Sequence, residues 1–241
     1  MLTEVRISSS NILRGVLQEI TPQFERETAC KLTITYGPPI QIKTCLMRGD
    51  AIDLVLVGAP GLEELQRDGL IKAESRRNIA TNYIGVAVRE GVAKPDIGSV
   101  EAVKRMLLAA RSIVYTDPAV GGRSGIQFAK VIDRLGIADQ IKAKSILNDG
   151  SLSAELIARG EVDVAIQFIS EIVPVQGVQL VGPLPEELQD VTVVAGAIAK
   201  NAAHPGVAKA LLDFLTSPSA AQVIKARGME PCMRPSEVRA S

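Results

Sequence analysis

The glycine-rich segment 116–125 contains Arg123, the residue with the clearest capacity for chemistry in this chain. Ser124 follows it and begins a stretch with helical periodicity, so the guanidinium is expected at the start of a helix. A guanidinium can bind a carboxylate through two parallel hydrogen bonds, and the first N–H groups of a helix attract the same kind of anion. The glycines of the segment would let the backbone approach a ligand closely. We therefore predict that Arg123 and Ser124 bind an anion; the alternative is a solvated surface arginine.

Sequence patterns for metal, nucleotide or nucleophilic chemistry are not found. His204 is the only histidine and lies where a helix should begin, so no Ser-His-Asp arrangement is expected around it. Cys30, Cys45 and Cys232 lack metal-binding spacing, and their odd number argues against a disulfide framework. HExxH, CxxC and GxxxxGK[ST] are missing, and the GGRSG turn lacks the spacing of a dinucleotide site. We expect no metal and no cofactor.

Composition excludes several classes of partner. Hydrophobic residues make up 46% of the 241 residues, enough for a sizeable core, and Trp is absent. The 27 basic residues balance 27 acidic ones, so there is no basic field to hold nucleic acid. No apolar run approaches the roughly 18 residues that a membrane-spanning helix needs. We expect a monomer that binds neither nucleic acid nor a membrane.

Strand-like and helical patterns alternate along the chain, which predicts an α/β fold with mostly parallel sheets. The predicted strands are 5–7, 31–36, 52–57, 83–89, 112–115, 141–147, 162–168, 179–181 and 191–198. The predicted helices are 11–27, 38–48, 62–67, 100–110, 124–135, 151–159 and a pair between 204 and 227. Ligands of such sheets bind outside the carboxyl ends of the strands.

The C-terminal pair, AAHPGVAKALLDFLTSPSAAQVIKARGMEP, resembles the tail of bacterial extracellular solute-binding proteins, the ligand-capturing parts of ABC importers. Further segments appear in the order of that family: VRISSSNILRGVLQEITPQFERET, LMRGDAIDLVLVGAP, YTDPAVGGRSGIQFAKVIDRLGI and LIARGEVDVAIQF. Together they resemble type 2 periplasmic binding proteins, and among these the molybdate-binding family most closely. The resemblance implies two lobes, each a mostly parallel sheet flanked by helices, that close on a ligand in the cleft between them.

The expected lobes follow partly from this resemblance. Residues 1–82 plus 196–241 would form lobe 1, and residues 83–195 would form lobe 2. The strands 83–89 and 191–198 would be the two crossing segments, and these would act as the hinge.

In molybdate binders, polar loops ahead of helix N-termini hold the oxyanion. The first such loop here contains Ser9, Ser10 and Asn11, with Ser10 or Asn11 in the place of the family's hydroxyl ligand. The alternative is that this serine or asparagine only caps the helix. The second loop runs from Tyr36 to Pro39 and replaces a serine-rich turn, so donors that a molybdate cage needs are missing. Tyr36 would supply a phenolic donor and Pro39 a wider, less polar wall, unless the segment is only a structural turn.

Three further loops complete the implied site. Molybdate sites usually avoid charged side chains, so Arg123 in the third loop favours a carboxylate. In the fourth loop Asp149 would cap a helix, and Gly150 would offer its backbone to the ligand. In the fifth, the family's tyrosine corresponds to Phe168, whose missing hydroxyl would be replaced by Gln167 or Ser170 unless Phe168 only packs.

These residues favour a solute-binding protein that captures a small anion, either an organic carboxylate or an oxyanion, with an ABC transporter permease as partner. The alternative is a cofactor-free isomerase of a small polycarboxylic acid, since some relatives of the molybdate binders are aconitate isomerases. Arg123 would then clamp the substrate, and Asp149, Tyr36, Asp117 or a lysine would be the base. A third interpretation is a cytoplasmic ligand sensor.

The segment before the first predicted strand has no signal-peptide pattern. We therefore expect a periplasmic protein if a signal was removed and a cytoplasmic one otherwise.

Overall fold

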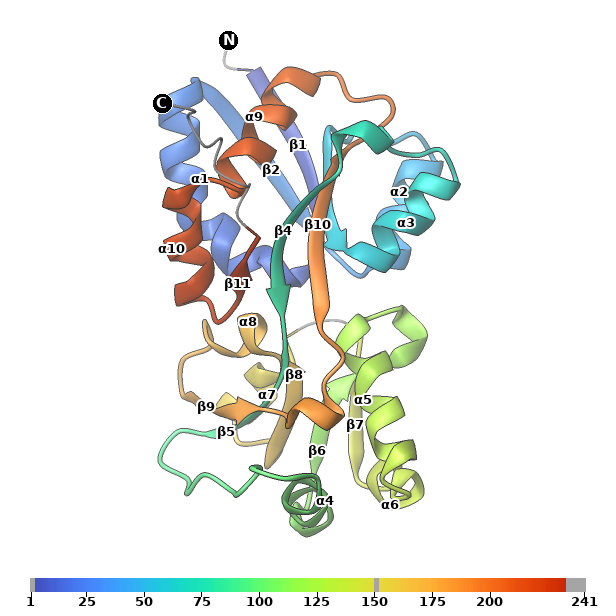
Figure 1. Cartoon of the computed structure of the whole chain (residues 1–241), viewed down its shortest axis with the longest axis vertical. Helices are drawn as coiled ribbons and strands as arrows, with labels where there is room; N and C mark the ends of the chain where they lie inside the picture. The colour runs from blue at the N-terminus through green and yellow to red at the C-terminus, as the bar shows by residue number, and fades with distance from the viewer. Residues whose placement is uncertain (1–2, 150–151, 233–241) are drawn as a thin grey trace, which may run out of the picture. The chain divides into compact units, whose positions relative to one another are not determined.

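A computed structural model describes residues 3–149 and 152–232. The chain divides into two compact units, each with its own sheet and flanking helices (Figure 1). Unit 1 consists of Met1–Tyr36, Ile42–Thr81 and Val193–Ser241, and unit 2 of Gly37–Gln41 and Asn82–Thr192.

The sheet of unit 1 has six strands in the order β11-β4-β10-β3-β1-β2. Their bounds are β1 Thr3–Ser9, β2 Cys30–Tyr36, β3 Leu54–Gly58, β4 Arg77–Asn82, β10 Thr192–Ile198 and β11 Glu230–Pro231. Strand β1 runs parallel to both β2 and β3, whereas β10 is antiparallel to β3 and β11 is antiparallel to β4.

Helices cover both faces of this sheet, and the central strand β3 is therefore buried along its whole length. They are α1 Arg14–Thr28, α2 Pro39–Met47, α3 Ala59–Arg67, α9 Pro205–Leu215 and α10 Pro218–Ala226, with 3-10 turns η1 Asn11–Leu13 and η2 Ala73–Ser75. Figure 1 shows α1, α9 and α10 on one face, where Phe24 and Phe214 meet edge to face at 5.7 Å. On the other face Val55 and Val57 pack with Leu62 of α3.

The sheet of unit 2 has five strands in the order β7-β6-β8-β5-β9. The strands are β5 Ile84–Arg89, β6 Ile113–Thr116, β7 Ser145–Asn148, β8 Val164–Phe168 and β9 Val178–Pro183. The helices are α4 Val100–Ala109, α5 Arg123–Arg134, α6 Ala138–Lys142, α7 Ala154–Ala158 and α8 Ile169–Ile172, with 3-10 turns η3 Pro118–Val120 and η4 Glu186–Leu188. Strand β6 is parallel to β7 and β8, and β5 is antiparallel to β8 and β9.

The predicted α/β class is confirmed, and both sheets are mixed. Strand β1 is parallel to β2 and β3, and β6 is parallel to β7 and β8, while β10 and β5 run against their neighbours β3 and β8. The predicted strand 141–147 is wrong in its first half, because residues 138–142 form helix α6. Among the described residues, no helix combines the length and the apolar character needed to cross a membrane.

Candidate functional site

Polar residues gather in unit 1 where its three parallel strands end. Ser9 pairs in register with Tyr36 of β2 and with Leu56 of β3. The backbone N–H of Ser10 donates to the carbonyl of Leu56 at 2.8 Å, which continues the pairing one residue beyond β1. Together with Asn11 and Arg14 just downstream, Ser9, Ser10 and Tyr36 form what we call the polar edge of unit 1.

The hydroxyl of Ser10 does not cap the helix, contrary to the simpler interpretation of this loop. Ser10 precedes the 3-10 turn η1, α1 begins only at Arg14, and the Ser10 side chain makes no capping bond. Ser10 is 5% exposed, and its Oγ has no hydrogen-bond partner within the described parts of the chain. Leaving a buried hydroxyl unpaired costs about 1–3 kcal/mol, so this oxygen is a group that a bound ligand could satisfy.

Arg14 is the residue of this edge that the sequence analysis missed. Its Nε donates to Oδ1 of Asn11 at 3.0 Å, and its Cζ lies 4.5 Å from the centroid of the Tyr36 ring. Arg14 is half-buried, and no described carboxylate forms an ion pair with its guanidinium. The spacing of three between Asn11 and Arg14 was a usable signal, because residues three apart share a helix face.

Burial raises the pKa of Tyr36, and the positive charge of Arg14 opposes this only in part. The phenol therefore stays protonated at neutral pH, when it can donate a hydrogen bond but cannot act as a base. Pro39, predicted as part of the same loop, is the half-buried first residue of α2 and is grouped with unit 2.

Arg123 begins α5 in unit 2, as predicted, but it already has an anionic partner. Its Nη2 lies 2.7 Å from Oδ2 of Asp190, and Gln127 fixes the backbone of Asp190 by donating to its carbonyl at 2.7 Å. The Arg123 Nε is buried and has no partner among the described residues. Ser124 is buried beside it. The charge of Arg123 is thus largely compensated within its own unit.

The glycines around Arg123 are explained by packing inside unit 2. A Cβ at Gly125 would lie 1.8 Å from the carbonyl oxygen of Thr116, and one at Gly122 would lie 2.5 Å from the Thr116 Cγ2. Position 125 must be glycine for α5 to approach the end of β6, because the obstacle there is backbone, whereas at position 122 the obstacle is a side-chain methyl group.

The remaining predicted residues of unit 2 follow β7 and β8. Asp149 is exposed after the end of β7, and Gly150 lies outside the described residues. Gln167 is buried, and its Oε1 accepts from the N–H of Ala154 at 3.2 Å, which secures the first turn of α7. Phe168 is 1% exposed at the end of β8 and pairs with Ile84, which is a packing position. The hydroxyl of Ser170 accepts from Nδ2 of Asn82 at 2.7 Å.

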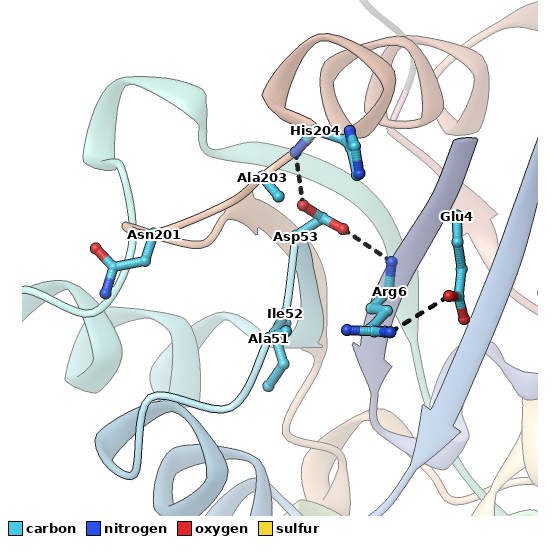
Figure 2. A pocket seen from close by; sticks show the side chains of 8 residues that line it. All are labelled: Glu4, Arg6, Ala51, Ile52, Asp53, Asn201, Ala203 and His204. Carbon is cyan, nitrogen blue, oxygen red and sulfur yellow. Dashed lines mark hydrogen bonds and ion pairs between the residues drawn. The ribbon is translucent and has the colours of Figure 1, made fainter. Parts of the chain in front are cut away.

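A pocket in unit 1 lies toward the opposite end of β1, away from the polar edge (Figure 2). The eight residues that line it are Glu4, Arg6, Ala51, Ile52, Asp53, Asn201, Ala203 and His204. Asp53 uses both carboxylate oxygens inside the protein, accepting from the backbone N–H groups of Arg6 at 2.9 Å and His204 at 2.8 Å. The side chain of Arg6 pairs with Glu4 at 3.3 Å. With its charges already paired, this pocket offers little to an ion, and the described residues hold no cluster of acidic, histidine or cysteine side chains that could bind a metal.

Comparisons with known proteins agree over nearly the whole chain. A family profile described as bacterial extracellular solute-binding protein matches residues 5–230. Aconitate isomerase from Pseudomonas sp is 32% identical over 236 residues, covering 95% of this chain and 88% of that protein. The periplasmic molybdate-binding protein of Azotobacter vinelandii has a TM-score of 0.80 at 19% identity, covering 96% of this chain and 100% of that one. The sulfate-binding protein SubI from Mycobacterium tuberculosis H37Rv has a TM-score of 0.76 at 16% identity, covering 95% and 87% respectively. At these identities the two structures are evidence for the fold alone.

Proposed function

Because the chain belongs to the bacterial extracellular solute-binding proteins and has the two-lobed α/β fold of type 2 periplasmic binding proteins, we propose that it captures a small anion, an organic carboxylate or an oxyanion. The observation that carries the proposal is the buried, unpartnered hydroxyl of Ser10 at the polar edge of unit 1. It lies directly ahead of η1 and α1, whose first N–H groups favour negative charge.

In unit 2 we propose that the start of α5 at Arg123 and Ser124 contributes to the same site, together with the segment at Asp149 and Gly150. The ligand would then be bound by residues of both units. The aconitate isomerase that is 32% identical to this chain supports an anion as the ligand, because aconitate is a small anion.

An organic carboxylate is the preferred ligand. The segment at the end of β2 reads Tyr36-Gly37-Pro38-Pro39 and contains no serine hydroxyl. Its two prolines have no backbone N–H, so the segment offers fewer hydrogen-bond donors than a serine-rich turn would. A molybdate ion removed from water needs a complete cage of donors, because an unpaired buried charge is costly. A carboxylate places its charge on two oxygens and can be held by fewer groups.

A thermal-shift panel tests this proposal. The probes are citrate, cis- and trans-aconitate, succinate, sulfate, phosphate and molybdate, with sodium chloride at equal ionic strength as the control. At 100 times its dissociation constant a ligand adds about 2.7 kcal/mol of stability, which in a protein of this size raises Tm by about 5–10 °C. A shift with carboxylates supports the proposal. A shift with molybdate alone contradicts the ligand class, and no shift with any probe contradicts anion capture.

The identity of 32% to an aconitate isomerase across 95% of the chain favours a second candidate, a cofactor-free isomerase of a small polycarboxylic acid. Such a reaction moves one proton from a carbon beside a carboxyl group to another carbon, so it needs a base. Tyr36 is unsuited because its pKa is raised by burial. Asp117 accepts from the N–H of Ala119 at 2.9 Å and is half-buried, and Asp149 is exposed, so both carboxylates remain candidates.

Proton NMR of cis-aconitate in deuterated buffer tests the isomerase. Conversion to trans-aconitate with deuterium incorporation would establish turnover, and Asp117→Asn and Asp149→Asn would then identify the base. Unchanged cis-aconitate at high protein concentration, in a sample that still binds it, would leave capture as the function. As a capture protein we propose that it delivers its ligand in the periplasm to an ABC transporter permease.

A further inference from the structure

We infer that Arg14 is the charged anchor of the ligand site in unit 1, held in place by Tyr36 and Asn11 so that it binds a carboxylate group end-on. This inference rests on the proposed function and gives it a residue that the sequence analysis did not consider. It also narrows the ligand class to organic acids that can present a carboxylate to unit 1.

The guanidinium of Arg14 is held from two directions. The Tyr36 ring lies against one face, with Cζ 4.5 Å from the ring centroid, and Asn11 accepts from Nε at 3.0 Å. Both contacts leave the two terminal nitrogens, Nη1 and Nη2, without a partner in the described chain. These two nitrogens form the edge of the fork that binds the two oxygens of a carboxylate in parallel.

Among the half-buried arginines that the structure describes, Arg14 and Arg77 lack a carboxylate partner, and of these two only Arg77 donates to backbone carbonyls. Arg76, Arg123 and Arg227 have side chains 28–30% exposed, and each has a carboxylate, from Glu63, Asp190 and Glu19 respectively. Arg77 donates instead to two backbone carbonyls. Arg14 has only the neutral amide of Asn11 and an aromatic face. Since a shielded charge is costly without compensation, the anion that would pair with Arg14 is expected from outside the chain.

Ser10 provides an independent indication on the same short segment. The Ser10 hydroxyl is buried and has no partner among the described residues. Ser10 also directly precedes the 3-10 turn η1, and the first N–H groups of a helical turn have no partner within the turn. The guanidinium of Arg14 and the hydroxyl of Ser10, four residues apart in the sequence, therefore each have a donor without an acceptor. A carboxylate oxygen satisfies both requirements, whereas the pocket in Figure 2 has its own acidic groups, Glu4 and Asp53.

Tyr36 acts as a positioning residue in this arrangement. Contact with its ring limits the movement of the guanidinium, so less freedom is lost when the ligand binds. Tyr36→Phe keeps the aromatic face and Tyr36→Leu removes it. If the ring matters, Tyr36→Leu weakens binding more than Tyr36→Phe does.

Isothermal titration of citrate and trans-aconitate tests the inference. Arg14→Gln is expected to weaken binding by about 10- to 100-fold, the equivalent of losing a hydrogen-bonded charge. Arg14→Lys keeps the charge but not the two-pronged geometry, so it should recover only part of the affinity. Arg26→Gln removes the same charge from the exposed last turn of α1 and is the matched control. Raising the salt concentration should weaken binding to the wild type more than to Arg14→Gln.

Thermal unfolding of the ligand-free variants separates this role from a structural one. Arg14→Gln removes no ion pair but does remove the hydrogen bond to Asn11 and the contact with Tyr36, so we expect Tm to fall by only a few degrees while binding falls by roughly the 10- to 100-fold given above. A residue that only supports the fold would lower Tm and leave the affinity of the folded protein unchanged. If Arg14→Gln binds citrate and trans-aconitate as the wild type does, the inference is wrong while anion capture stands. If the wild type binds none of the probes in the panel, the proposed function fails and the inference fails with it. Should Arg14→Gln unfold, Arg14→Lys decides: affinity equal to the wild type for both probes overturns the end-on geometry.

Discussion

Asp53 lies toward the end of β1 opposite the polar edge and connects three segments of unit 1. Its two oxygens accept from the backbone of Arg6 in β1 and of His204 ahead of α9, and its own N–H donates to the Arg6 carbonyl at 2.8 Å (Figure 2). The side chain is 4% exposed. The Asp53 carboxylate has a structural role, because both of its oxygens bind the backbone of other segments of unit 1.

Replacing Asp53 by Ala should therefore destabilise the protein without changing what it binds. Two backbone donors lose their acceptor, which we expect to cost about 2–3 kcal/mol of unfolding free energy. Urea denaturation measures this, with Asp50→Ala as the control, because Asp50 is exposed and its ion pair with Arg48 lies at the surface. A loss of unfolding free energy no larger than that of the control would show that Asp53 does not have this structural role.

At the residue scale the sequence indicated where helices begin better than it indicated the tertiary contacts of the candidate residues. Ser10 and Arg123 could be located because each precedes a recognisable helix. The ion pair of Arg123 with Asp190, 67 residues away, depends on tertiary contacts that no local pattern contains. The same is true of Arg14, whose position against Tyr36 follows from the register that pairs Ser9 with Tyr36. Sequence reasoning therefore selected Arg123, whose charge is compensated by Asp190, and passed over Arg14.

At the scale of elements, the long periodic segments were predictable and the short ones were not. Helix α5 and strand β3 carry strong patterns, whereas the apolar residues at 141–147 fit a strand or a helix equally well. The structure divides that run between α6 and β7, and β7 is an edge strand in which Ile146 and Leu147 remain exposed. The short β11 and the four-residue α8 depend on their neighbours in the sheet rather than on their own sequence.

The contact between α5 and β6 gives a prediction at this scale. Gly125→Ala would place a methyl group 1.8 Å from the Thr116 carbonyl oxygen, so α5 must move away from the sheet. Because the obstacle is backbone, we expect a loss of several kcal/mol or a failure to fold, more than the ~1–3 kcal/mol usual for overpacking.

The matched control is the same substitution in another helix. Gly206 is in the first turn of α9, and a Cβ there would meet nothing within 4 Å. Gly206→Ala should be neutral or stabilise by up to about 1 kcal/mol, because alanine favours helix more than glycine does. Thermal denaturation of both variants provides the comparison. Equal effects would mean that close packing does not explain the glycine at 125.

At the scale of the whole molecule, each unit has its own sheet and apolar core, so each could open separately. Inside unit 2 the side chain of Gln189, shortly before β10, accepts from the N–H of Ile84 at 3.1 Å and donates to its carbonyl at 2.6 Å. Asn82 is fully buried and bonded to Ser170. We propose that any hinge motion is confined to the few residues where the chain passes between units, because the crossing strands are secured on the unit 2 side.

A ligand held by both units should couple their stabilities, and hydrogen exchange can measure this unit by unit. In the free protein the amides of β3 report on unit 1 and those of β6 on unit 2. An opening that releases the ligand becomes rarer by a factor of about 100 when the ligand is at 100 times its dissociation constant. At that concentration we expect citrate or trans-aconitate to slow exchange about 100-fold in both strands of the wild type, but only about 2- to 11-fold in Arg14→Gln, whose binding is about 10- to 100-fold weaker. Protection confined to β3 would mean that unit 1 binds the anion alone, and the proposed contribution of Arg123 and Ser124 would have to be abandoned.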